Sequence, residues 1–185
     1  MGHPIASFDF GDDGHLAFSI EIRPEKHEEF DVLGSVYRKF ELIYVAADER
    51  DVVRVRTNIR PNESVTLYRV MTTPEHARAR LLEYVARLNA LHRSPEWYNV
   101  ITANCTTSIR AQRPQTERIP WDWRILLNGN ADKMLYDHGG LDQTLPFAEL
   151  KRRSLINTVA KAADHAPYFS ARIREGLPGF TNTND

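Results

Sequence analysis

The single cysteine of the chain, Cys105, follows an asparagine and precedes two threonines in the stretch NVITANCTTSIR. Asn and Thr commonly cap the N-terminus of a helix, so the pattern predicts a helix over residues 104–112. A thiol in the first turn of a helix lies near the positive end of the helix dipole and near backbone N–H groups that lack intrahelical partners. These features favour the thiolate and suit an oxyanion, so Cys105 is a candidate nucleophile. The alternative is an inert, half-buried cysteine.

A cysteine nucleophile needs a base, usually histidine, and a polar group that orients the base. The chain has seven histidines, and the predicted strands distinguish one of them. Residues 4–10 and 15–23 flank the turn sequence GDDG, and apolar and polar residues alternate in the second stretch. This pattern predicts an antiparallel hairpin.

The register of that hairpin brings a histidine and a carboxylate together. If the even-numbered residues of both strands face the core, His3, Ser19 and Glu21 share the other face, and His3 lies roughly opposite Glu21. A carboxylate beside an imidazole fixes its tautomer and raises its basicity. The alternative for Glu21 is an exposed strand charge or an ion pair with Arg23 or Arg54.

Further elements must position these residues. Hydrophobic patterns predict three more strands, at residues 40–50, 51–60 and 64–71. Helices are predicted at residues 73–93, 104–112, 119–139 and 146–163. In the first of these, Thr73 is the expected N-cap, and the apolar residues recur at helical spacing: Leu81, Leu82, Val85, Leu88 and Leu91. The fold class predicted is α+β: an antiparallel sheet, a long helix and a helical C-terminal third. One domain is expected over residues 1–180, with a disordered tail at residues 181–185.

Composition limits the function classes. The chain has 185 residues with ordinary globular composition, and its net charge of −1 gives no electrostatic case for binding nucleic acid. A single cysteine allows neither an internal disulfide nor a zinc site of several cysteines. We expect no metal and no cofactor. The sequence has no apolar run long enough to span a bilayer, and the segment MGHPIASFDF lacks the regions of a signal peptide.

Five long segments, in this order, resemble the N-terminal periplasmic domain of Lnb, a bacterial lipoprotein N-acyltransferase. They are HPIASFDFGDDGHLAFSIEIRPEK, FELIYVAADERDVVRVRTN, SPEWYNVITANCTTSI, PWDWRILLNG and LPFAELKRRSLIN. The resemblance covers nearly the whole chain. That domain is in turn similar to circularly permuted papain-like folds of the NlpC type, in which the histidine strand precedes the cysteine helix. Only two residues precede His3 here. We therefore expect that the chain is a fragment of a longer protein, or that its start is mis-assigned.

The resemblance implies a function for the candidate residues. Cys105 matches the nucleophile and His3 the base, and Glu21 fits the third polar position, with Ser19 as the fallback. The implied reaction is acyl transfer through a cysteine thioester, with a phospholipid or diacylglyceryl lipid as donor and a lipoprotein amine as acceptor. The implied location is the periplasm or the outer face of the inner membrane, with a membrane surface as a further partner.

Several residues near the site have two interpretations. Ser19, Tyr98, Asn104 and Thr106 are candidate substrate-binding residues, and the tryptophans that could line an acyl groove fit core packing better. A second group of polar residues, Arg54, Arg56 and Asn58, lies on the strand predicted at residues 51–60. These residues could bind a lipid phosphate. A solvated strand face on which they pair with Asp48, Glu49 and Asp51 fits better.

Two other function classes use the same fold. A papain-like cysteine hydrolase, such as an amidase or peptidase of the cell envelope, would have the same catalytic residues and differ in the acceptor. A non-catalytic binding domain would keep the fold without an activated thiol. Only the family resemblance favours the acyltransferase over these two alternatives.

Overall fold

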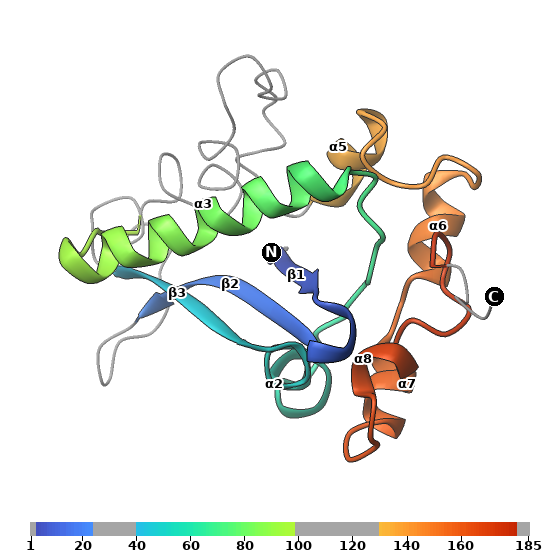
Figure 1. The fold of residues 1–185 in the computed structure, drawn as a ribbon. Coiled ribbons are helices and arrows are strands. Elements are labelled where there is room, and N and C mark those ends of the chain that lie inside the picture. Colours follow the sequence, from blue (N-terminus) through green and yellow to red (C-terminus); the bar gives the residue numbers. More distant parts are fainter. Residues whose placement is uncertain (1–2, 24–39, 99–129, 181–185) are drawn as a thin grey trace. The chain divides into compact units, whose positions relative to one another are not determined.

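The structure, a computed structural model, describes residues 3–23, 40–98 and 130–180 (Figure 1). Its elements confirm the predicted α+β class, with a three-stranded antiparallel sheet, one helix of 20 residues and short C-terminal helices. The chain divides into two compact units. The first comprises residues 1–6, 18–46 and 73–134, and the second comprises residues 7–17, 47–72 and 135–185. Each unit is described by itself.

The sheet has the strand order β1–β2–β3, so β2 is the central strand. β1 spans Ile5–Asp9, β2 spans His15–Arg23 and β3 spans Glu41–Asp48. Residues 17–20 of β2 are all buried, although their side chains point alternately to the two faces of the sheet. Both faces of the central strand are therefore covered at this point, and a polar residue there is removed from water.

The turn between β1 and β2 is a short 3-10 helix, Gly11–Asp13. The backbone N–H of Gly11 donates to Asp9 Oδ1 at 2.8 Å, and the N–H of Phe10 donates to the carbonyl of Gly14 at 2.9 Å. Gly14 has a φ of 94°, which favours glycine. These contacts account for the GDDG sequence as a turn.

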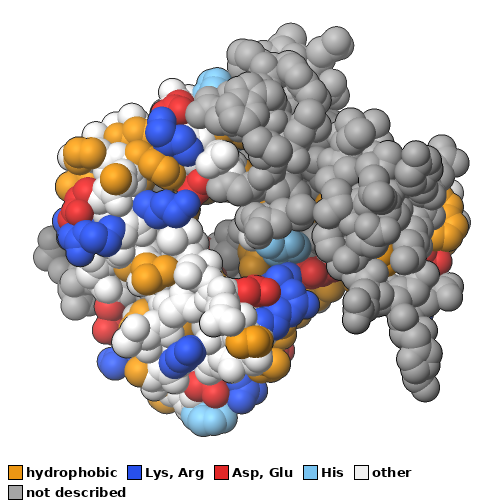
Figure 2. Space-filling model, turned by 180° about the vertical axis from the view of Figure 1, so that it is seen from behind, with side chains coloured by type: hydrophobic (Ala, Val, Ile, Leu, Met, Phe, Trp, Pro, Cys, Tyr) orange, Lys and Arg blue, Asp and Glu red, His pale blue; other side chains and the backbone are white. Residues whose placement is uncertain are grey.

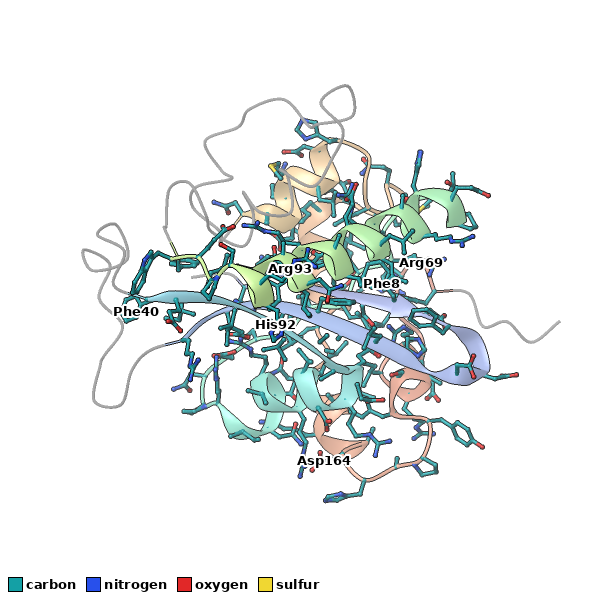
Figure 3. The ribbon with its side chains drawn as sticks, turned by 60° about the vertical axis from the view of Figure 1, so that its left-hand side comes forward. Phe8, Phe40, Arg69, His92, Arg93 and Asp164 are labelled. Atoms are coloured by element: carbon teal, nitrogen blue, oxygen red, sulfur yellow. The ribbon has the colours of Figure 1, made fainter. Side chains whose placement is uncertain are left out.

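The long helix α3 spans Pro74–Arg93 and begins as predicted. Thr73 caps it, because its hydroxyl oxygen accepts a hydrogen bond from the N–H of His76 at 3.3 Å. Proline occupies the first turn, where it costs no hydrogen bond. The last turn carries His92 and Arg93 (Figure 3), which complement the negative end of the helix dipole.

One buried tyrosine of α3 packs against the strands of its unit. The ring of Tyr84 lies 5.1 Å from the ring of Phe18 on β2 and 6.2 Å from that of Tyr44 on β3. The apolar spacing predicted for this helix was partly misleading, because Leu82 is 58% exposed and Val85 is 40% exposed. Leu82 lies roughly 160° around the helix from Tyr84, so it cannot share the buried face.

The segment predicted as a strand at residues 51–60 is helical. It forms α2, Glu49–Arg54, followed by a π-helix, η2, Val55–Ile59. Asp48 caps α2 through a hydrogen bond from the N–H of Arg50 at 2.8 Å. The buried residues recur at helical spacing, and they are Glu49, Val52, Val53, Arg56 and Thr57. Residues at this spacing lie on one face of a helix but on both faces of a strand. Tertiary burial therefore overrides the alternating VVRVR pattern.

The strand predicted at residues 64–71 is reduced to one bridge residue, and the helix predicted at residues 146–163 is divided into two shorter helices. The two segments meet at an isolated antiparallel bridge between Thr66 and Leu155. The bridge interrupts the helix, which becomes α6, Phe147–Arg153, and α7, Asn157–Ala162.

Hydrogen bonds on both sides of the bridge fix this break. The N–H of Leu67 donates to the carbonyl of Ser154 at 2.9 Å, and the N–H of Ile156 donates to that of Val65 at 3.0 Å. The side chain of Asn157 accepts from the N–H of Val65 and donates to the carbonyl of Glu63, each at 2.8 Å. Since these partners come from a distant segment, helix propensity alone gave no sign of the break.

The second unit has its own apolar core. It includes α8, Phe169–Arg172. α5, Ala131–Asp137, begins in the first unit and ends shortly before Gly139, whose φ is 71°. The buried members of the core cluster come from α2, α7 and α8 and from residues that flank α7 and α8, and they are Val53, Ile156, Ala160, Ala163, Phe169, Ile173 and Leu177. This cluster is assembled from residues more than 100 positions apart.

No helix in the described ranges is long and apolar enough to cross a membrane. On the face shown in Figure 2, basic and acidic side chains are interspersed among the coloured atoms. This mixture agrees with the near-zero net charge of the chain.

Candidate active site

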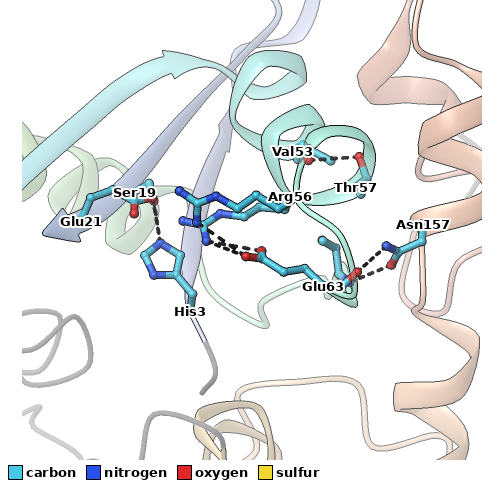
Figure 4. A network of polar contacts seen from close by, with 10 residues as sticks. His3, Ser19, Glu21, Val53, Arg56, Thr57, Glu63 and Asn157 are labelled. Carbon is cyan, nitrogen blue, oxygen red and sulfur yellow. Dashed lines mark hydrogen bonds and ion pairs between the residues drawn. The ribbon is translucent and has the colours of Figure 1, made fainter. Parts of the chain in front are cut away.

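A histidine, a serine and a glutamate meet beside the β1–β2 hairpin, all within the first unit (Figure 4). His3 lies just before β1, and Ser19 and Glu21 lie two residues apart on β2, so their side chains share one face of the strand. His3 Nε2 lies 2.7 Å from Ser19 Oγ and 3.2 Å from Glu21 Oε1. The Ser19 hydroxyl donates to Glu21 Oε1 at 2.6 Å.

The directions of these hydrogen bonds follow from the chemistry of the groups. An ionised carboxylate only accepts, so the proton of the Ser19 hydroxyl points to Glu21. The Ser19 oxygen must then accept from His3 Nε2, which therefore carries the ring proton. In the neutral ring, Nδ1 is consequently the nitrogen with the lone pair. These contacts fix which ring nitrogen of His3 carries the proton.

Burial differs among the three side chains. Ser19 is 1% exposed, whereas the side chains of His3 and Glu21 keep 24% and 22% exposure. The hydroxyl is held away from water, whereas the ring and the carboxylate are partly open to solvent. A buried hydroxyl without a partner would cost free energy, so its two hydrogen bonds also stabilise this arrangement.

The structure confirms the predicted contact between His3 and Glu21, and the roles of both residues remain predictions. The arginines considered as alternative partners of Glu21 contact other carboxylates. Arg23 lies 3.6 Å from Glu41, and Arg54 Nε lies 2.7 Å from Asp164 Oδ1; Figure 3 labels Asp164. Sequence reasoning treated Ser19 as a fallback for Glu21, but the structure places both around one nitrogen.

The predicted nucleophile, Cys105, lies outside the described residues, as do Asn104 and Thr106. Tyr98 is described; its side chain is buried and its N–H donates to the carbonyl of Phe40 at 2.7 Å. This contact holds Tyr98 beside the residue that precedes β3. Its role in binding substrate remains a prediction.

The polar group proposed for a lipid phosphate does not lie on a strand. Arg54 belongs to α2, and Arg56 and Asn58 belong to η2, so the three do not alternate along one face. Arg54 pairs with Asp164, and Arg56 Nη1 lies 3.3 Å from Glu63 Oε2. These partners replace the acidic residues expected from the sequence, because a helix directs the arginines elsewhere.

A second carboxylate site, in the second unit, was not foreseen. Glu49 is 1% exposed, and each of its oxygens accepts a hydrogen bond from the guanidinium of Arg174 at 2.7 Å. Arg174 also donates to the carbonyl of Ser170 at 2.7 Å, and its guanidinium lies 5.5 Å from the centre of the Phe180 ring. The partners are 125 residues apart, so no local pattern signalled them.

Burial acts to raise the pKa of Glu49, but hydrogen bonds and charge from Arg174 outweigh it, with help from the hydroxyls of Ser170 and Ser7. The pKa of Glu49 therefore lies below its ordinary value. Within the ranges that the structure describes, no group of three His, Cys, Asp or Glu side chains is arranged to hold a metal ion.

The fold and the cluster define an α+β domain in which a partly exposed imidazole and carboxylate meet a buried hydroxyl beside the first hairpin. Residues 1–129 match the family described as the Lnb N-terminal periplasmic domain, and the chain belongs to this family. The domain is accordingly assigned to the periplasm. Comparisons with curated proteins and with solved structures gave no significant match.

Proposed function

We propose that this domain is a cysteine-dependent acyltransferase in which Cys105 is the nucleophile, His3 the base and Glu21 the group that orients His3. The observation that carries the proposal is the contact of His3 Nε2 with Ser19 and Glu21, which leaves Nδ1 as the basic nitrogen. Membership of the Lnb N-terminal periplasmic domain family supports it.

In the first half-reaction, His3 Nδ1 takes the proton of the Cys105 thiol, and the thiolate attacks the ester carbonyl of a phospholipid or diacylglyceryl lipid. Backbone N–H groups beside Asn104 and Thr106 hold the oxyanion of the tetrahedral intermediate. The carbon–oxygen bond of the ester then breaks. The alcohol leaves with the proton from His3, and the acyl group stays on Cys105 as a thioester.

In the second half-reaction, the amine of a lipoprotein attacks the thioester carbonyl. A carbon–nitrogen bond forms, His3 accepts a proton from the amine, and the carbon–sulfur bond breaks. Cys105 leaves as a thiolate and recovers its proton from His3. The acyl chain is now an amide, and the site has returned to its starting state.

The proposed arrangement is that of a circularly permuted papain-like fold, with the histidine strand first and the cysteine helix later. The chain order supports it, since His3 precedes β1 and Cys105 follows α3. Tyr98 precedes the nucleophile by seven residues, and we assign it to substrate binding near the thioester. A periplasmic location supports a substrate at the outer face of the inner membrane.

The test is a product assay with the 185-residue chain. Phosphatidylethanolamine vesicles serve as donor, and a synthetic diacylglyceryl-cysteine peptide with a free N-terminal amine serves as acceptor. We expect N-acylated peptide and an equal amount of deacylated donor, either lysophospholipid or monoacylglyceryl peptide, by mass spectrometry, and no product with Cys105→Ala.

Two results would contradict the transferase. Free fatty acid without N-acylated peptide would indicate a hydrolase. Equal product with Cys105→Ala and the unaltered chain would remove the cysteine from the chemistry. The chain has only one cysteine, so an acyl mass increment on the intact protein that neutral hydroxylamine removes, and that Cys105→Ala lacks, would place the thioester on Cys105.

A further inference from the structure

We infer that Ser19 is a positioning residue through which Glu21 sets the tautomer of His3. The inference deepens the proposed function and rests on it in one respect, namely that His3 acts as a base. The role differs from substrate binding, because the Ser19 hydroxyl acts on the ring of His3 and need not contact the substrate.

The distances favour transmission through the hydroxyl. Ser19 Oγ lies 2.6 Å from Glu21 Oε1 and 2.7 Å from His3 Nε2, whereas the direct distance from Nε2 to Oε1 is 3.2 Å. Short, charge-assisted hydrogen bonds are the stronger ones. The principal path from carboxylate to ring therefore passes through the serine, and the direct contact is secondary.

The hydroxyl of Ser19 can point in only two useful directions. When it donates to Glu21, its oxygen accepts from Nε2–H, and Nδ1 keeps the lone pair. When it donates to Nε2, the ring proton must be on Nδ1, and Nδ1 can then no longer accept a proton. The negative charge of Glu21 selects the first direction.

Burial makes this selection effective. Ser19 is 1% exposed, and it lies in the central strand between β1 and β3. Water cannot readily supply an alternative acceptor for its proton. If Glu21 lost its acceptor oxygens, the hydroxyl would donate to His3 Nε2. The tautomer of His3 would then reverse.

The experiment is long-range ¹H–¹⁵N NMR of the imidazoles at about pH 8.5, where histidines are neutral. The resonances of His3 are assigned by comparison with His3→Gln. Four chains are compared: the unaltered one, Glu21→Met, Ser19→Ala and the double variant. Methionine keeps an unbranched side chain of similar reach and supplies no strong acceptor.

We expect the Nε2–H form in the unaltered chain and in Ser19→Ala, where Glu21 contacts the ring directly. Glu21→Met should shift His3 to the Nδ1–H form. The double variant should return to Nε2–H, because the hydroxyl that reverses the ring is gone. Ser19→Thr, which keeps a hydroxyl, should behave as the unaltered chain does.

Retention of the Nε2–H form in Glu21→Met, or Nδ1–H in the double variant, would overturn the inference. If Glu21→Met does not fold, as judged by circular dichroism, Glu21→Leu at the same position provides the comparison, because leucine also has no acceptor oxygen. A reversal with Leu that Ser19→Ala does not remove would likewise overturn it.

Alkylation of Cys105 by iodoacetamide separates this inference from the proposed function. We expect Glu21→Met to slow alkylation and the added Ser19→Ala to restore part of the rate. If the tautomers change as expected while the alkylation rate is constant, His3 is not the base for Cys105. In that case the proposed function fails, and the role of Ser19 in setting the tautomer stands.

Discussion

The two units each contain a carboxylate that accepts hydrogen bonds from other side chains, but the partners and the burial differ. In the first, Glu21 is partly exposed and lies beside a hydroxyl and an imidazole whose proton can move. In the second, Glu49 is almost fully buried and is held by both terminal nitrogens of Arg174. An arginine stays protonated, so the Glu49–Arg174 pair has one protonation state near neutral pH. An imidazole can exchange its proton in that pH range. The chemistry of the partner and the depth of burial thus suit Glu49 to stability and Glu21 to its proposed role beside a base.

The largest effect is expected from breaking the pair in the second unit. Arg174→Ala leaves the buried carboxylate of Glu49 without its guanidinium, and loss of one partner of a buried ion pair costs about 3–5 kcal/mol. Urea denaturation would measure this loss in the free energy of unfolding. The matched control is Arg172→Ala, because Arg172 is 58% exposed and lies 3.6 Å from Glu175. Similar losses for both variants would mean that the buried Glu49–Arg174 pair stabilises the protein no more than an exposed ion pair does.

The next effect is kinetic and concerns the first unit. His3→Ala should slow alkylation of Cys105 at neutral pH by at least about 100-fold, because the thiol loses its base. His15→Ala is the matched control, since His15 Nε2 also lies near a carboxylate, 3.6 Å from Asp9 Oδ1. The mass increment of the intact protein with time gives both rates. Equal slowing by the two variants would show that His3 has no particular connection with the thiol.

Acid should remove the stability that Glu49 contributes. The pKa of Glu49 is lowered in the folded state, so its contribution to stability is complete above the unfolded pKa and disappears as pH falls through the folded one. The free energy of unfolding should therefore fall more steeply with acid, once pH is below the ordinary glutamate pKa of about 4.3, than it does in Glu49→Gln. Urea denaturation at several pH values tests this. Parallel curves for the two proteins would assign the acid sensitivity to other groups.

The smallest effect tests whether stability and reactivity in the first unit can be separated. Thr73→Ala removes the N-cap of α3 and should lower the free energy of unfolding by about 1 kcal/mol. The alkylation rate of Cys105 should not change, because Thr73 does not contact His3, Ser19 or Glu21. Thr73→Ser, which keeps the capping oxygen, should show little loss. A large fall in alkylation rate with Thr73→Ala would mean that α3 positions the site more tightly than its contacts indicate.

Local patterns were sufficient where an element forms from neighbouring residues. The hairpin turn at residues 11–14, the start of α3 at Thr73 and the contact between His3 and Glu21 follow from turn chemistry, capping and strand register. These interactions join residues close in sequence or paired through a short loop, so a single stretch of chain contains the necessary information.

Local patterns failed where a distant segment competed for the same backbone. Residues 51–59 alternate like a strand, yet Val53 is buried against the C-terminal helices and the segment is helical. The helix predicted across Leu155 is broken because that residue bridges Thr66. For the site, the sequence indicated which side chains face the same way, but not that Ser19 is buried between two polar partners.

The sequence by itself determined the hairpin, the long helix and a histidine facing a glutamate, because each depends on spacing along one or two adjacent strands or turns. Only the tertiary structure decided that Glu49 meets Arg174, that the C-terminal helix divides and that Ser19 shares one nitrogen of His3 with Glu21. The reason is physical: hydrogen-bond distance and access to water depend on which surfaces pack together, and those surfaces come from segments far apart in the chain.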